Sequence, residues 1–140
     1  MKSADARTVR LDIASRIEML DMVQAVLNHL CSVVGFNEEA IHYMSVAIRE
    51  SVVNAMKHGN KLDEGKRVTL AFVLQAGALE VTVQDEGAGF DPALVPDPVA
   101  EENLLKAYGR GIFFMRSFMD NVAYSFEKGG TTVTMLKKVV

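Results

Sequence analysis

Residues 68–85 read VTLAFVLQAGALEVTVQD, and this stretch decides the fold class. Apolar side chains alternate with other residues in both halves, which predicts two strands that each turn one face toward a core. Residues 75–78, QAGA, separate the halves and predict a tight turn at a glycine. Two strands joined by so short a turn are antiparallel, so the stretch predicts a hairpin. The inward-facing residues are Val68, Leu70, Phe72, Leu74, Leu79, Val81 and Val83.

A strand and a helix are expected first along the chain. Residues 8–13 alternate in the same way and predict a short strand. Ser15 and Glu18 match a capping box, in which the two side chains satisfy free amides at a helix start. The helix that begins there is expected to run to about Val34 and to stop at Gly35.

A second helix is expected to begin after Asn37 and to stop at Gly59. Its apolar side chains recur at helical spacing, which predicts one stripe facing the core. The stripe consists of Ile41, Met44, Ile48, Val52 and Ala55.

Residues 87–108 differ from the rest of the chain because they hold two glycines and all three prolines. A loop of this length inside a compact domain is typical of a functional segment. The elements expected beyond its start are a short helix over 101–107, a helix over 111–119, and a hairpin of residues 122–126 and 131–138.

The order β-α-α-β-β-loop-α-β-β predicts an α/β (α+β) two-layer sandwich. We expect a mixed, mostly antiparallel sheet covered by helices on one face. The length of 140 residues suits one domain over residues 1–140.

Composition narrows the function classes. A net charge of −3 with scattered basic residues favours neither nucleic acid nor an anionic membrane as a partner. The single cysteine, Cys31, lies among apolar residues and cannot form an internal disulfide, which fits packing in a reducing cytoplasm. The chain shows no signal peptide and no apolar run that we expect to span a bilayer, so a cytoplasmic location is expected.

Glu50 and Asn54 are four residues apart, so a helix places them on one face, one turn apart. An asparagine amide oxygen is a hard, neutral ligand suited to Mg²⁺. A carboxylate one turn earlier can accept a proton from an attacking hydroxyl group or water. On its own the pair is more often an exposed polar face.

Asp85 continues the inward alternation of the second strand, where a carboxylate is costly unless a donor satisfies it. The exocyclic amine of adenine is such a donor. Gly87 and Gly89 allow the backbone to approach a planar base. The alternative is that the segment simply ends a strand in a turn.

Gly109-Arg110-Gly111 lies just before an expected helix, whose free amides favour phosphate oxygens. Arg110 or Lys106 can add positive charge. The segment is neither a Walker-type loop nor a dinucleotide fingerprint, and a plain loop-to-helix junction remains the alternative.

Gly130-Thr131 begins the last expected strand, and Thr131 can hydrogen-bond near Asp85 if their strands are neighbours. His58 can contact a phosphate, although a histidine at a helix end is more often structural.

Together these patterns resemble the ATP-binding superfamily shared by gyrase, heat-shock chaperones, sensor histidine kinases and mismatch-repair proteins. Residues 47–59 and 85–90 resemble its asparagine-containing helix and its adenine-binding box. Gly109–Gly111 and Gly130-Thr131 resemble its glycine box and its last box. Within the superfamily, the chain is similar to the small bacterial anti-sigma factors that are serine/threonine kinases.

The resemblance implies a Bergerat-type ATP-binding fold and a role for each matched residue. Glu50 is the expected general base, Asn54 the magnesium ligand and Asp85 the adenine-selecting group. Residues 90–108 are the expected lid over ATP. The other residues expected to bind the nucleotide are His58, Gly87, Gly89, Phe90, Lys106, Gly109, Arg110, Gly111 and Thr131.

The resemblance also implies partners. The expected activity is ATP-dependent phosphorylation of an anti-anti-sigma factor, with Mg²⁺ as cofactor, by a homodimer that holds a sigma factor inactive. One alternative is a non-catalytic switch, in which ATP only alters the affinity for a partner. Others are one half of a split histidine kinase and an interaction domain with a decayed nucleotide site.

Overall fold

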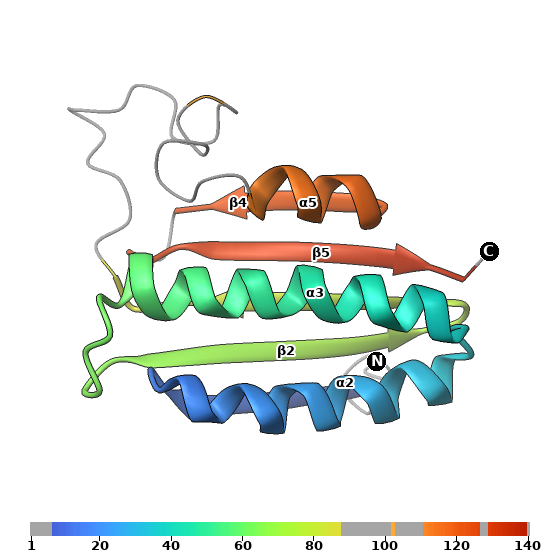
Figure 1. Ribbon diagram of the computed structural model, residues 1–140, viewed down its shortest axis with the longest axis horizontal. Coiled ribbons are helices and arrows are strands. Elements are labelled where there is room, and N and C mark those ends of the chain that lie inside the picture. Colours follow the sequence, from blue (N-terminus) through green and yellow to red (C-terminus); the bar gives the residue numbers. More distant parts are fainter. Residues whose placement is uncertain (1–6, 88–101, 103–110, 127–128, 140) are drawn as a thin grey trace.

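The computed structural model describes residues 7–87, 102, 111–126 and 129–139, with the backbone alone at 111–114. These residues form two layers (Figure 1): the helices α2, α3 and α5 lie side by side across one face of a sheet. The expected α/β sandwich with helices on one face is confirmed.

The sheet has five strands in the order β1-β2-β3-β5-β4, and each described pairing is antiparallel. The strands are β1 (Thr8–Ala14), β2 (Arg67–Gln75), β3 (Ala78–Gln84), β4 (Asn121–Ser125) and β5 (Thr132–Lys138). The hairpin predicted over residues 68–85 is formed by β2 and β3. Gly77 lies in its turn and has a φ of 69°. Because β5 pairs with β3, the ends of two strands distant in sequence meet at the middle of the sheet.

The helical elements follow the expected order. They are η1 (Ile17–Met19), α2 (Leu20–Val34), α3 (Glu38–Asn54), η2 (Ala55–Gly59) and α5 (Gly111–Phe118). Gly35 ends α2 with a left-handed φ of 106°, as expected of a glycine C-cap. Asn37 caps α3, because its Oδ1 accepts a hydrogen bond of 2.8 Å from the Ala40 amide.

The capping box predicted at Ser15 and Glu18 is wrong. Ser15 is buried, and its Oγ donates a hydrogen bond of 2.7 Å to the carbonyl of Lys66. Glu18 instead pairs with the exposed guanidinium of Arg16 at 2.5 Å. The chain makes a short 3-10 turn at Ile17–Met19 before α2 begins at Leu20. The Ser15 hydroxyl group does not cap a helix, because it is bonded to the Lys66 carbonyl.

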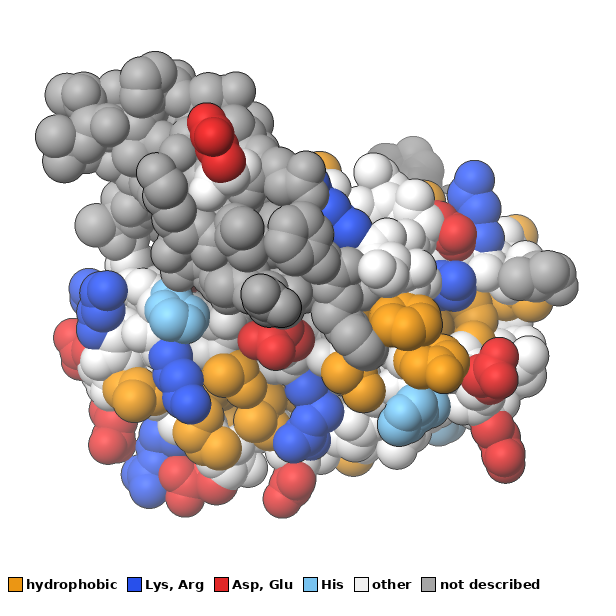
Figure 2. Space-filling view, turned by 45° about the horizontal axis from the view of Figure 1, so that its top comes forward, with side chains coloured by type: hydrophobic (Ala, Val, Ile, Leu, Met, Phe, Trp, Pro, Cys, Tyr) orange, Lys and Arg blue, Asp and Glu red, His pale blue; other side chains and the backbone are white. Residues whose placement is uncertain are grey.

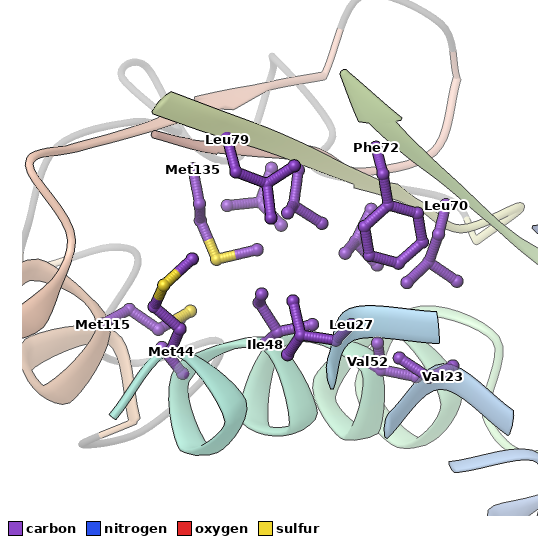
Figure 3. Packing of buried hydrophobic residues seen from close by; sticks show 14 of the residues in the cluster. Val23, Leu27, Met44, Ile48, Val52, Leu70, Phe72, Leu79, Met115 and Met135 are labelled. Atoms are coloured by element: carbon purple, nitrogen blue, oxygen red, sulfur yellow. The ribbon is translucent and has the colours of Figure 1, made fainter. Parts of the chain in front are cut away.

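The core lies between the two layers. The inward side chains of β2 and β3 predicted from the alternation pack against α2, α3 and α5 (Figure 3). Met44 of α3, Met115 of α5 and Met135 of β5 fill the space where the third helix meets the sheet. Cys31 is fully buried, and burial raises the pKa of its thiol to about 12, so it serves as a packing residue.

One stretch contradicts an expectation about membranes. Residues Ile17–Val34 have a mean hydropathy of 1.3 and are long and apolar enough to cross a bilayer by length and composition alone. In the fold, however, Val23, Leu27 and Leu30 of this stretch pack into the core. One face of this stretch is therefore part of the domain core, and 28% of the stretch is buried.

Candidate functional site

Asp85 lies directly after β3 and points into the molecule, as its place in the alternation predicted. Its side chain is only 3% exposed. Oδ1 accepts two backbone hydrogen bonds, from the Gly87 amide at 2.9 Å and from the Thr131 amide at 3.0 Å. The predicted closeness of Thr131 and Asp85 is confirmed. It follows from the β3–β5 pairing, which continues through an Asp85 amide to Thr131 carbonyl bond of 3.0 Å.

Three glycines allow the backbone to close around this carboxylate. A Cβ on Gly59 would lie 2.0 Å from Oδ2 of Asp85, and a Cβ on Gly130 would lie 2.1 Å from the Asp85 carbonyl oxygen. A Cβ on Gly87 would lie 2.1 Å from the carbonyl oxygen of Gly59. The end of η2 and the ends of β3 and β5 can therefore meet only where side chains are missing.

These contacts show why Gly59 and Gly87 must be glycines, which the sequence alone did not indicate. Gly59 ends the helical segment as expected, but its φ is not left-handed; the Asp85 carboxylate is what excludes a side chain there. Gly87 was expected to let a base approach. The backbone of Gly59 already requires a glycine at that position, and the approach of a base stays a prediction.

Burial raises the pKa of the Asp85 carboxyl group. The hydrogen bonds from Thr131 and Gly87 and the charge of Lys66 act in the opposite direction and are outweighed. Both described hydrogen bonds go to Oδ1, so Oδ2 is the atom that can still accept from a ligand donor. A neutral ligand with an N–H group is suited to this acceptor.

Asn54 ends α3 and faces the same space. Its side chain is 6% exposed, and its Nδ2 is enclosed without a hydrogen-bond partner among the described residues. Oδ1 is not among the enclosed unpartnered atoms. With the nitrogen enclosed, the oxygen lies on the other side of the amide group, which is the orientation that a metal ligand would need.

Glu50 lies one turn before Asn54 on α3, with a half-buried side chain. Its side chain forms no ion pair with the described part of the chain. The predicted shared face is confirmed by the helix, which runs unbroken from Glu38 to Asn54.

A small cavity joins the two halves of the site. Its volume is ≈ 10 Å³, about the space of one water molecule. It is lined by Ser51, Asn54, Ala55, Val83, Asp85, Tyr124, Thr131 and Val133. Asn54 and Asp85 thus share one space, as expected. The cavity is much smaller than a nucleotide, so it can form only the floor of a nucleotide site.

The helix changes its winding immediately after Asn54. Residues Ala55–Gly59 form a π-helical turn, η2, a feature that is often found at functional sites. It carries Lys57 and His58 on the exposed side. The structure therefore places His58 near the end of the Asn54 helix, and its predicted phosphate contact stays a prediction.

Asn60 is a residue that the sequence analysis missed. It is fully buried, and its Nδ2 donates to Ser15 Oγ at 2.8 Å and to the Arg67 carbonyl at 2.9 Å. Its Oδ1 accepts from the Glu86 amide at 2.8 Å, and its own amide donates to the Ala55 carbonyl at 2.8 Å. Asn60 thus connects, by hydrogen bonds, the residue after β1, the first residue of β2, the start of η2 and the segment after β3. The only signal in the sequence is an asparagine after a glycine, which a turn alone would explain.

Several predicted residues lie outside the part of the chain that the structure describes. They are Gly89, Phe90, Lys106, Gly109 and Arg110, with the expected lid over residues 90–108 and most of the short helix over 101–107. Gly111 is described as the first residue of α5.

Within the described ranges, no three histidine, cysteine or acidic side chains form a metal-binding group. A metal at this site would have Asn54 as a protein ligand and would take others from phosphate oxygens and water. Mg²⁺ commonly binds in this way, so the donor set fits magnesium bound to a nucleotide.

Comparisons with known proteins show the family and the fold of the chain. Residues 13–137 match the profile of the histidine kinase-like ATPase domain. The chain is 28% identical over 137 residues to the serine-protein kinase RsbW of Listeria monocytogenes serovar 1/2a, covering 94% of this chain and 87% of that protein. The corresponding protein of Bacillus subtilis is 28% identical over 139 residues, covering 95% and 86%.

An anti-sigma F factor of Clostridium acetobutylicum is 36% identical over 104 residues, covering 71% of each chain. Among solved structures, a Mycobacterium tuberculosis chain with RsbU and RsbW domains matches with a TM-score of 0.67 and 20% identity. The match covers 94% of this chain but 32% of that longer one, and it shows a shared fold.

Proposed function

Because the chain belongs to the histidine kinase-like ATPase domain family, we propose that it is an ATP-dependent protein serine/threonine kinase that acts as an anti-sigma factor. Its substrate is a serine or threonine of an anti-anti-sigma partner. When the partner is phosphorylated and released, the kinase holds a sigma factor inactive. In this proposal residues 1–140 form one cytoplasmic domain.

The buried Asp85 carboxylate is the observation that carries the proposal. Two backbone amides donate to Oδ1, and Oδ2 remains as an acceptor. Asp85 lines the same cavity as Asn54. The 6-amino group of adenine is a donor that satisfies this acceptor, whereas the carbonyl group at the same position of guanine would repel it. Asp85 would therefore select ATP over GTP.

Asn54 and Glu50 supply the remaining chemistry. Asn54 Oδ1 would hold the magnesium ion, whose charge neutralises the triphosphate when it is bound. Glu50 would take the proton of the partner's hydroxyl group as that oxygen bonds to the γ-phosphorus. The bond from the γ-phosphorus to the bridging oxygen breaks, and ADP leaves. The half-buried Glu50 lies one turn from Asn54, so the base and the metal ligand stand on the same helix face.

The remaining predicted contacts complete the phosphate end of the site. Gly109, Arg110, Gly111 and Lys106 would surround the phosphates at the start of α5, and His58 would contribute from η2. The segment over 90–108 would close above the nucleotide.

The chain also has a surface suited to a homodimer. β1 is an edge strand of the sheet, with an outer side that pairs with no described strand. Figure 2 shows acidic and basic side chains interspersed over the face that it draws, which suits contacts with proteins more than with a polyanion. We assign the edge of β1 as the place where two copies would pair.

The proposal is tested by incubating the protein with Mg-ATP and an anti-anti-sigma domain, and by detecting phosphoserine or phosphothreonine. Replacing Glu50 with glutamine should lower the transfer rate by at least about a hundredfold and leave ATP affinity nearly unchanged, because only proton acceptance is lost. Glu38→Gln, an exposed change in the first turn of the same helix, is the matched control. Equal transfer by the Glu50 variant would remove the assigned base.

A non-catalytic switch gives a different result in the same experiment. In that case ATP changes the affinity for the partner, and no phosphorylated product forms with any anti-anti-sigma domain. A phosphohistidine product, which acid destroys, would point instead to one half of a split histidine kinase.

A further inference from the structure

Two buried polar atoms in the site have no hydrogen-bond partner among the described residues. They are Ser51 Oγ and Asn54 Nδ2, and their side chains are 3% and 6% exposed. Leaving a buried donor or acceptor unsatisfied costs about 1–3 kcal/mol, and native proteins almost always satisfy such groups. Something other than the described protein atoms must therefore bond to them.

Both atoms belong to one cavity. Ser51 and Asn54 are three residues apart on α3, so they lie on the same helix face, and both line the ≈ 10 Å³ space beside Asp85 and Thr131. This volume is about the smallest that holds a water molecule. The lining offers a hydroxyl group, an amide donor and a carboxylate, which meets the requirement of two to four polar partners. An apolar group in this space would leave both atoms unsatisfied.

A water at this position has a consequence for the metal ligand. Asn54 Nδ2 can only donate, so it needs an acceptor on the protein side. When Nδ2 donates to the water, the amide plane is fixed and Oδ1 stays on the opposite, ligand-facing side. The Ser51 hydroxyl group can both donate and accept, so it can hold the water in place. Groups that orient a metal ligand from behind in this way commonly change metal affinity tenfold or more when removed.

We propose that Ser51 is a positioning residue: through one buried water molecule, it holds the Asn54 amide with Oδ1 directed at nucleotide-bound magnesium. The same water would lie beside Asp85, so it would connect the carboxylate proposed to bind adenine with the asparagine proposed to bind magnesium. This inference rests on the proposed function.

The test compares two changes at Ser51 with a matched control. Ser51→Ala removes the hydroxyl group, and Ser51→Thr retains it. Ser45→Ala removes another buried hydroxyl group of α3 that bonds to Gln24 at 2.8 Å and to the Ile41 carbonyl at 2.7 Å, outside the cavity. Calorimetry gives the dissociation constant of ATP with Mg²⁺ and with EDTA for each protein.

We expect Ser51→Ala to lower the enhancement of ATP affinity by Mg²⁺ about tenfold, while the affinity in EDTA changes less than about twofold. Ser51→Thr and Ser45→Ala should keep the enhancement of the parent protein. Full enhancement in Ser51→Ala, or an equal loss with and without Mg²⁺, would overturn the inference while leaving the proposed kinase intact. A parent protein that binds no ATP would overturn both.

A second measurement does not depend on any variant. A high-resolution crystal structure of the nucleotide-free parent protein should show one water within hydrogen-bond distance of Ser51 Oγ and Asn54 Nδ2. An empty cavity, or an Asn54 amide whose oxygen points inward, would overturn the inference.

Discussion

Oδ2 of Asp85 lies so close to Gly59 that a Cβ on this glycine would be 2.0 Å from it. The contact joins the end of the Asn54 helix to the end of the central strand. The buried carboxylate and the amide side chain of Asn54 both line one cavity. The closeness of the helix end to the strand end therefore depends on a position that has no side chain.

Gly59→Ala should disrupt this junction. The added methyl group cannot fit beside the carboxylate, so we expect a loss of about 1–3 kcal/mol in the free energy of unfolding and a marked loss of ATP affinity. Gly65→Ala is the control, because a Cβ there would meet only the exposed side chain of Asp63 at 3.2 Å. Urea unfolding and calorimetry with ATP measure both effects. A Gly59 variant with the same free energy of unfolding and the same ATP affinity as the control would contradict the close packing of Gly59 against Asp85.

Asp85→Asn should weaken selection of adenine. The Gly87 and Thr131 amides require an acceptor at Oδ1, so the new NH₂ group must take the place of Oδ2 and would face the amine of the base. A hydrogen bond to a charged group contributes about 1.5–3 kcal/mol, so we expect a loss of about tenfold to a hundredfold in the preference for ATP over GTP. Competition binding with both nucleotides measures it, with Asp63→Asn in the exposed loop as control. An unchanged preference would exclude Asp85 as the adenine-reading group.

The stability of the protein should depend on pH through Asp85. Burial raises the pKa of this carboxyl group in the folded state, so the folded protein binds the proton more tightly than the unfolded chain. Its contribution to stability is then fully present below the ordinary aspartate pKa of about 3.9 and is lost as pH rises through the raised value. Asp85→Asn removes this pH-dependent loss of stability, because an amide does not ionise. We expect the variant to be more stable than the parent at neutral pH, by a margin that shrinks as pH falls.

Urea unfolding of both proteins across a pH series measures that margin. ATP binding by the parent should follow the opposite trend and weaken as pH falls through the raised pKa, because a neutral carboxyl group is a poorer acceptor. A margin that is constant with pH would show that Asp85 does not titrate differently in the folded protein.

Asn60→Ala should destabilise the protein more than any change at an exposed asparagine. It removes the bonds of 2.8 Å that Asn60 makes with Ser15 Oγ and with the Glu86 amide, in a part of the protein where Asn60 itself is fully buried. Ser15 Oγ keeps its bond to the Lys66 carbonyl, whereas the Glu86 amide loses its acceptor. Each lost partner costs about 1–3 kcal/mol, so we expect a fall of about 2–5 kcal/mol in the free energy of unfolding. Asn28→Ala, on the exposed side of α2, is the control. A loss equal to the control would contradict the role of Asn60 as a tie between elements.

The fold could be predicted because its signals are local. The alternation of residues 68–85 shows which side chains face the core, and the glycines at 35 and 77 take left-handed conformations that few other residues adopt. Ser15 shows the limit of local patterns. Its match to a capping box was good, but a carbonyl 51 residues away uses its hydroxyl group instead.

The sequence by itself determined the strands and helices of the described residues and singled out Asn54 and Asp85 as candidate site residues, since periodicity and residue chemistry are properties of short segments. Only the tertiary structure decided that these two residues share a cavity, that Gly59 is required by a carboxylate, and that Asn60 ties four segments together. The physical reason is that β3 pairs with β5 and the helices pack across both strands. Distances of a few ångströms between residues far apart in sequence arise only from that pairing and packing.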